Sequence, residues 1–125
     1  MSEPIRIVSQ DALESGPPTP GMNRKKAIAS DNVWMGEVRT DPGVMSGWHH
    51  HGEHTTFGYV MDGSVRVEFG PNGSESLEGG AGDFFMVPPN TVHREGNPGD
   101  YEQVVMAVRV GTGPAVINVD GPDAE

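Results

Sequence analysis

Short segments of alternating apolar and polar residues, separated by Gly- and Pro-rich turns, constrain the fold of this chain most strongly. Residues 33–40 and 102–111 show the two-residue period of half-buried strands. The 18 Gly and 11 Pro gather between such segments, as in Asp41-Pro42-Gly43. No segment of useful length shows the period of a helix. The chain is therefore expected to be all-β, with a sandwich or barrel architecture.

Several strands carry specific expectations about pairing and about which side chains share a face. Asp62-Gly63 is expected to form a hairpin between residues 55–61 and 64–69. Residues 84–87 are apolar throughout, so we expect this strand to be covered on both faces. In the segment 102–111, alternation places Val104, Met106, Val108 and Val110 on one face, and Gln103 and Arg109 on the other.

A length of 125 residues fits one domain with an N-terminal extension. Residues 1–30 are expected to form an arm that packs on its own barrel or on a partner's, because residues 15–21 contain three prolines and two glycines. Residues 31–125 form the expected barrel. Ile5–Val8 is a short strand candidate that would cover an exposed sheet edge of a second subunit, so a homodimer is expected.

Charge and composition exclude several classes of partner. Eighteen acidic and eight basic residues give a net charge of −10, which repels nucleic acid and anionic membrane surfaces. No run approaches the roughly 18 apolar residues of a membrane span, and the N-terminus has no signal-like apolar region. A soluble cytoplasmic protein with a small-molecule partner is the expectation. Because cysteine is absent, any metal must be bound by histidine.

Three histidines on two strand-like segments form the candidate metal site. His49 and His51 are two residues apart, so on a strand they share one face, whereas His50 points to the other. His93 lies in a separate segment. Three imidazoles can hold a metal ion and leave coordination positions open, which indicates chemistry rather than a structural site. His54 lies at a turn and is a possible fourth ligand.

Both histidine segments have regular spacing of glycine, proline and histidine. The first contains Gly43, His49, His51 and Gly63, and the second contains Gly82, Pro88, His93 and Asn97. Together they resemble the two motifs of the cupin superfamily, over roughly residues 33–110. The resemblance implies a double-stranded β-helix, or jelly roll. This chain departs from the family at Thr56, which stands where the first motif usually has a glutamate, and at Asn90, which replaces a glycine in the second.

A metal site of three neutral histidines without the glutamate leaves both positive charges of the ion uncompensated. Anionic substrate oxygens are then expected to bind the metal directly. Three residues are candidates for the substrate pocket: Met45 and Met106 as apolar walls, and Thr56 as a hydrogen-bonding group for substrate or water.

Cupins with three-histidine sites include iron-dependent dioxygenases, so the resemblance implies an Fe(II) dioxygenase-like enzyme that acts on a small anionic or chelating substrate. A second hypothesis is a Zn-, Mn- or Ni-dependent lyase or isomerase in which the metal is a Lewis acid. Cobalt is also compatible with imidazole ligands. The third hypothesis is a non-catalytic protein that binds or senses a small molecule. The residues alone leave open the metal, the substrate and whether the protein is an enzyme.

Overall fold

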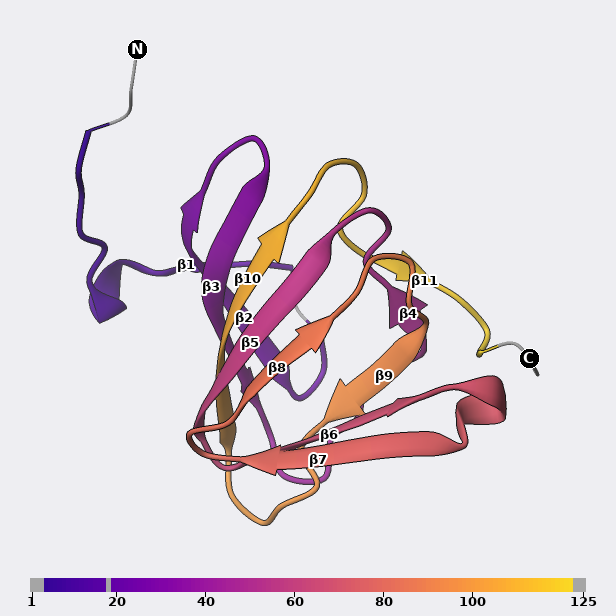
Figure 1. Cartoon of the computed structure of the whole chain (residues 1–125). Helices are drawn as coiled ribbons and strands as arrows, with labels where there is room; N and C mark the ends of the chain where they lie inside the picture. Colours follow the sequence, from indigo (N-terminus) through magenta and orange to yellow (C-terminus); the bar gives the residue numbers. More distant parts are fainter. Residues whose placement is uncertain (1–3, 18, 123–125) are drawn as a thin grey trace.

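The structure, a computed structural model, describes residues 4–17 and 19–122 and consists of two antiparallel sheets (Figure 1). The first sheet has the order β1 (Glu14–Ser15), β2 (Met22–Ala29), β3 (Val33–Thr40), β10 (Gln103–Val110), β5 (Thr55–Asp62) and β8 (Phe84–Val87). The second has the order β11 (Ile117–Asn118), β4 (His49–His50), β9 (His93–Gly96), β6 (Ser64–Phe69) and β7 (Glu75–Gly80). The short 3-10 helices η1 (Gln10–Ala12) and η2 (Pro71–Gly73) complete the regular structure. The expected all-β jelly roll is confirmed.

The core lies between the sheets and is made of small branched side chains. Its buried cluster consists of Val60, Val65, Val105 and Ala107, with Trp34, Val67 and Phe85 packed against it. Gly58 sits directly beneath the Phe85 ring, because a Cβ there would lie 2.2 Å from that ring. Among the described residues, no helix is long and apolar enough to cross a membrane.

The prediction that Met106 lines the substrate pocket assumed that its side chain points into the barrel. In the structure, the opposite face of β10 points inward. Val105 and Ala107 belong to the core cluster, so alternation places Gln103 and Arg109 on the inner face and Met106 on the outer one. Alternation failed to identify the inner face because the outer face of this sheet is itself rich in apolar residues. Five of them are exposed: Met35, Phe57, Met61, Phe84 and Met86.

Two further expectations about strands are wrong. Asp62-Gly63 does not form a hairpin, because β5 and β6 lie in different sheets and are not paired. Gly63 instead adopts a φ of 78° where the chain crosses between the sheets. The segment 84–87 is not covered on both faces, because β8 is an edge strand and the Phe84 side chain is 80% exposed.

The N-terminal region divides into an extended segment and a strand. Ile5–Val8 is not a strand in this structure, and Ile5 and Ile7 are exposed. Gln10 donates a hydrogen bond of 3.1 Å from Nε2 to the buried carboxylate of Glu37 on the outer face of β3. Residues 22–29 form β2 and pair with β3. This part of the expected arm therefore packs on the barrel of its own chain.

Candidate metal centre

The histidines come together because β4 and β9 are neighbours in the second sheet. His49 and His93 are register partners across these strands, and His51 follows two residues after His49. The ring centroids are 4.4 Å apart for His49 and His93, 4.9 Å for His49 and His51, and 5.1 Å for His51 and His93. All three side chains are buried. The predicted grouping of His49, His51 and His93 is therefore present in the fold.

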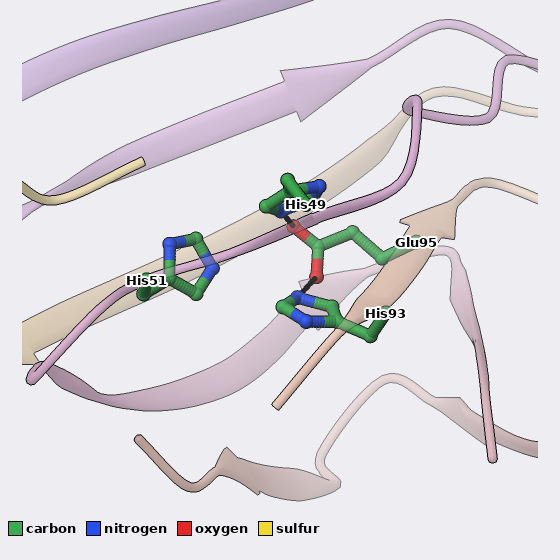
Figure 2. Close-up of side chains that lie close together, drawn as sticks. All are labelled: His49, His51, His93 and Glu95. Carbon is green, nitrogen blue, oxygen red and sulfur yellow. Dashed lines mark ion pairs between the residues drawn. The ribbon is translucent and has the colours of Figure 1, made fainter. Parts of the chain in front are cut away.

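The fourth member of the cluster is Glu95, which the sequence analysis did not consider. Glu95 lies two residues after His93 on β9, and its carboxylate points between the rings of His49 and His93 (Figure 2). Oε1 is 3.7 Å from Nε2 of His49, and Oε2 is 3.0 Å from Nε2 of His93. The glutamate of the first motif is absent, since Thr56 stands in its place, but Glu95 beside the second-motif histidine brings a carboxylate into the cluster. The spacing His93-x-Glu95 repeats that of His49-x-His51, and this pattern could have identified Glu95 as a candidate ligand.

The hydrogen bonds of the three imidazoles leave Nε2 available for a metal ion. Nδ1 of His49, His51 and His93 lies 2.9, 2.8 and 2.9 Å from the carbonyl oxygens of Gly47, Ala115 and Thr91 respectively. A neutral imidazole has one N–H, so donation from Nδ1 leaves a lone pair on Nε2. Nε2 of His93 is buried, and although it is close to Glu95 it has no aligned hydrogen bond.

The four residues fit a divalent transition metal. Their potential ligand atoms lie within 4.8 Å of one another. Nitrogen and oxygen ligands bind such an ion at about 2.0–2.2 Å, so only small shifts would bring all four atoms to one ion. Three imidazoles and one carboxylate suit Mn, Fe, Co, Ni or Zn.

The surroundings of His51 and His93 shift their pKa values in opposite directions. Burial, followed by the nearby Arg109 guanidinium, lowers the pKa of His51 to about 4. Burial alone would lower the pKa of His93, but the Glu95 carboxylate outweighs it and raises that pKa. Burial would raise the pKa of Glu95, yet His49 and His93 hold it well below its ordinary range. Near neutral pH the cluster therefore offers an ionised carboxylate beside a neutral His51.

The other predicted site residues lie outside this cluster. His54 is buried, but it is not among the grouped ligands, and its Nδ1 lies 3.1 Å from the carbonyl oxygen of His51. Thr56 is buried on the inner side of β5, and its hydroxyl has no hydrogen-bond partner. Met45 forms an isolated antiparallel β-bridge with Gly96. Neither Met45 nor Met106 lines either of the two cavities beside the cluster.

A cationic cavity of about 470 Å³ adjoins His49 and His51. Three basic residues line it: Arg24 and Lys26 from β2, and Arg109 from β10. The guanidinium of Arg109 lies 5.2 Å from the centre of the Trp34 ring, and its buried Nε has no hydrogen-bond partner. No carboxylate of the described residues lines this cavity. The arrangement favours an anionic ligand.

An apolar cavity of about 490 Å³ adjoins His93 on the other side of the cluster. Its wall is largely aliphatic and aromatic and includes Val65, Val67, Phe69, Leu77, Phe85 and Val87. Two carboxylates, Glu78 and Asp83, also line it. The cluster thus lies between two cavities of opposite chemical character.

Comparisons with known proteins agree with the fold and the histidine motifs. The sequence model of the cupin domain matches residues 36–109. The chain is 29% identical over 130 residues to germin-like protein subfamily T member 3 of Arabidopsis thaliana, covering 91% of this chain and 57% of that protein. This chain therefore spans little more than half the length of that relative.

Two groups of solved structures share the fold at low identity. KdgF from Halomonas sp. superposes with a TM-score of 0.73 at 23% identity, covering 86% of this chain and 96% of KdgF. Oxalate decarboxylase from Bacillus subtilis, which has Mn(II) centres, superposes with a TM-score of 0.70 at 23% identity, covering 82% of this chain and 29% of that enzyme. At this identity the likeness is one of fold alone. With the family match over most of the barrel and the histidines of both motifs gathered in one buried cluster, the chain belongs to the cupin family.

Proposed function

We propose that this protein is a metal-dependent enzyme that acts on a small organic anion, with the metal held by His49, His51, His93 and Glu95. The cationic cavity carries this proposal. Arg24, Lys26 and Arg109 line it beside two of the ligands, in a chain whose net charge is −10. Lys26 is paired with Glu14 at 3.2 Å, so the two arginines supply the charge for an anion. Because most of the protein repels anions, this local reversal of charge indicates an anion-binding site.

Arg109 is the residue we assign to binding the anionic group. Burial lowers the pKa of its guanidinium, although the Glu95 carboxylate opposes that effect. A partly buried cation whose Nε has no hydrogen-bond partner among the described residues is costly unless an anion pairs with it. A carboxylate in the cationic cavity would supply that partner and would accept hydrogen bonds from the guanidinium. Arg109 would thereby orient the substrate against the ligands His49 and His51.

We favour a lyase or isomerase over a dioxygenase as the reaction class. When bound, a divalent ion would act as a Lewis acid that stabilises negative charge developing on a substrate oxygen. A dioxygenase was expected for a ligand set without a carboxylate, whereas Glu95 places a carboxylate among the four candidate ligands. Mn(II) centres in oxalate decarboxylase, a cupin-fold relative named for a reaction of an organic anion, support Mn as the first metal to test.

An Fe(II) dioxygenase is the second candidate, because the imidazole-rich ligand set also suits iron. A non-catalytic protein that binds or senses an organic anion is the third. Homodimerisation and a cytoplasmic location remain predictions. The exposed apolar residues on the outer face of the first sheet, among them Phe57, Phe84 and Met86, support association between subunits.

Elemental analysis of untagged protein, followed by a substrate screen, tests the proposal. We expect about one divalent metal ion per chain, lost in the triple variant His49→Ala, His51→Ala, His93→Ala. Protein loaded separately with Mn, Fe and Zn is then screened against organic acids for product formation and for oxygen consumption. Turnover without oxygen uptake supports the lyase or isomerase, whereas oxygen uptake supports the dioxygenase.

Arg109→Gln tests the anion site, with Arg66→Gln as the control. Arg66 is a partly exposed arginine on β6 that pairs with Glu68 and Glu78, remote from the cationic cavity. We expect Arg109→Gln to keep the metal and to weaken acid binding by at least tenfold, while Arg66→Gln changes neither. Stoichiometric metal in the triple alanine variant, or equal acid binding in both arginine variants, would contradict the proposed function.

A further inference from the structure

We infer that the substrate is an amphipathic acid, whose anionic group binds in the cationic cavity and whose apolar part of several carbons occupies the apolar cavity. This inference rests on the proposed function and specifies its substrate class. It predicts that a monocarboxylate with an apolar body binds better than a small dicarboxylate or a polyhydroxylated acid.

Each of the two cavities is lined by a different part of the candidate metal cluster. His93 belongs to the wall of the apolar cavity, and His49 and His51 belong to the wall of the cationic one. The rings of His49 and His93 are only 4.4 Å apart between centroids. A molecule held at the cluster is therefore expected to extend into both environments.

The register of the second sheet defines a path from the cluster to the surface. Val67 on β6 is the partner of Glu95 on β9 and of Leu77 on β7, so these three residues lie in one row across the sheet. The row spans two strand spacings, roughly 10 Å. It begins at the ligand Glu95, passes over Val67, and ends at Leu77, which is 67% exposed. Such a row can accommodate an extended hydrocarbon chain.

Charge sets the orientation of the occupant. Of the two acidic residues in the wall of the apolar cavity, Glu78 is paired with Arg66, whereas the carboxylate of Asp83 would repel an anionic group placed there. The opposite cavity is lined by Arg24, Lys26 and Arg109, of which Lys26 is paired with Glu14. The cavity of about 490 Å³ also has the size and apolar lining typical of ligand pockets. An apolar space that stays empty forfeits packing contacts, whereas an apolar ligand would restore them.

A series of straight-chain carboxylates, from acetate to octanoate, tests the inference by calorimetry on the full-length Mn-loaded protein. We expect affinity to rise roughly three- to fourfold with each methylene buried, and to level off once the chain reaches Leu77. Acetate measures binding of the anionic group alone. Succinate, which would place its second carboxylate in the apolar cavity, should bind more weakly than butyrate.

Val67→Thr places a hydroxyl in the path with little change of shape. It should reduce the gain per methylene and leave acetate binding unchanged. Leu77→Ser, at an exposed position that folding tolerates, should end the rise at a shorter chain. Met61→Thr is the control, because Met61 is half-exposed and lines neither cavity.

The outcomes separate the two proposals. Affinity that does not depend on chain length, or a Val67→Thr variant with the parent's gain per methylene, would overturn the amphipathic substrate and leave the anion site standing. Failure of every acid, acetate included, to bind the Mn-loaded protein would overturn the anion site and this inference with it.

Discussion

Thr56 on β5 and Arg109 on β10 are register partners, and each has a buried polar atom that finds no hydrogen-bond partner within residues 4–17 and 19–122. The atoms are the hydroxyl of Thr56 and Nε of Arg109. Buried polar groups that lack partners cost free energy in the folded state. Two such groups on neighbouring strands, one of them in the wall of the cationic cavity, therefore lower the stability of the ligand-free protein.

Thr56→Val should therefore stabilise the ligand-free protein. Valine has nearly the same shape and removes a buried hydroxyl that has no partner, so we expect the free energy of unfolding to rise by about 1 kcal/mol. Urea unfolding of the metal-free protein measures it. The adjacent Thr55→Val, at a less buried position, is the control and should change stability by less. Destabilisation by Thr56→Val would show that the hydroxyl has a partner in solution.

Glu95→Gln should weaken metal binding by at least roughly tenfold, because it removes the one negative charge among the four ligands. Competition with a metal-sensitive dye at pH 7.5 gives the affinity. His54→Asn is the matched control: His54 is buried close to the site but lies outside the ligand group, so its metal content should equal the parent's. Loss of metal in His54→Asn alone would reassign the fourth ligand.

The metal-free protein should lose stability as the pH falls from 7 to 4.5. The folded-state pKa of His51 is about 4, below its ordinary value of 6.5. Its contribution to stability is therefore complete above pH 6.5 and is lost toward pH 4, by roughly 2–3 kcal/mol at pH 4.5. The raised pKa of His93 acts in the opposite sense, with stability that is present below pH 6.5 and lost above it.

His51→Asn isolates the contribution of His51. Asparagine can keep a hydrogen bond to the Ala115 carbonyl but does not titrate. Between pH 7 and 4.5 the variant should therefore lose roughly 2–3 kcal/mol less stability than the parent protein. Urea unfolding in the presence of a chelator measures both proteins at each pH. Equal losses in the two proteins would show that His51 is not neutral and buried in the absence of metal.

Association through the outer face of the first sheet can be tested with one exposed residue. If subunits meet there, Phe84→Lys should shift the mass measured by light scattering toward the monomer, because Phe84 is 80% exposed and lies on the edge strand of that sheet. Leu77→Lys, on the edge of the other sheet, is the control. A dimer that persists in Phe84→Lys would favour contact through the N-terminal segment instead.

The period of the strands predicted an all-β sandwich or barrel, and the resemblance to the cupin motifs implied the jelly roll. The spacing of the histidines predicted three members of the candidate metal cluster. Asn90 shows how closely local sequence reports local structure: it replaces a motif glycine and adopts a φ of 56°. The sequence could not assign the inner face of β10, because both faces carry apolar residues and the site itself places Arg109 inside. The sequence also could not show that β5 and β6 lie in different sheets, because the turn residues Asp62-Gly63 do not determine which sheet the next strand joins.

The hydrogen bond from Nδ1 of His51 to the carbonyl of Ala115 makes the metal centre depend on a segment distant in sequence. The same segment supplies β11, the only strand beside β4 at that edge of the second sheet among the residues described. Removing residues from 114 onward would leave the core strands paired, yet would free the His51 ring to rotate and to exchange its tautomer. We expect a chain shortened in this way to retain metal less well than the parent, because the orientation of one candidate ligand would no longer be fixed.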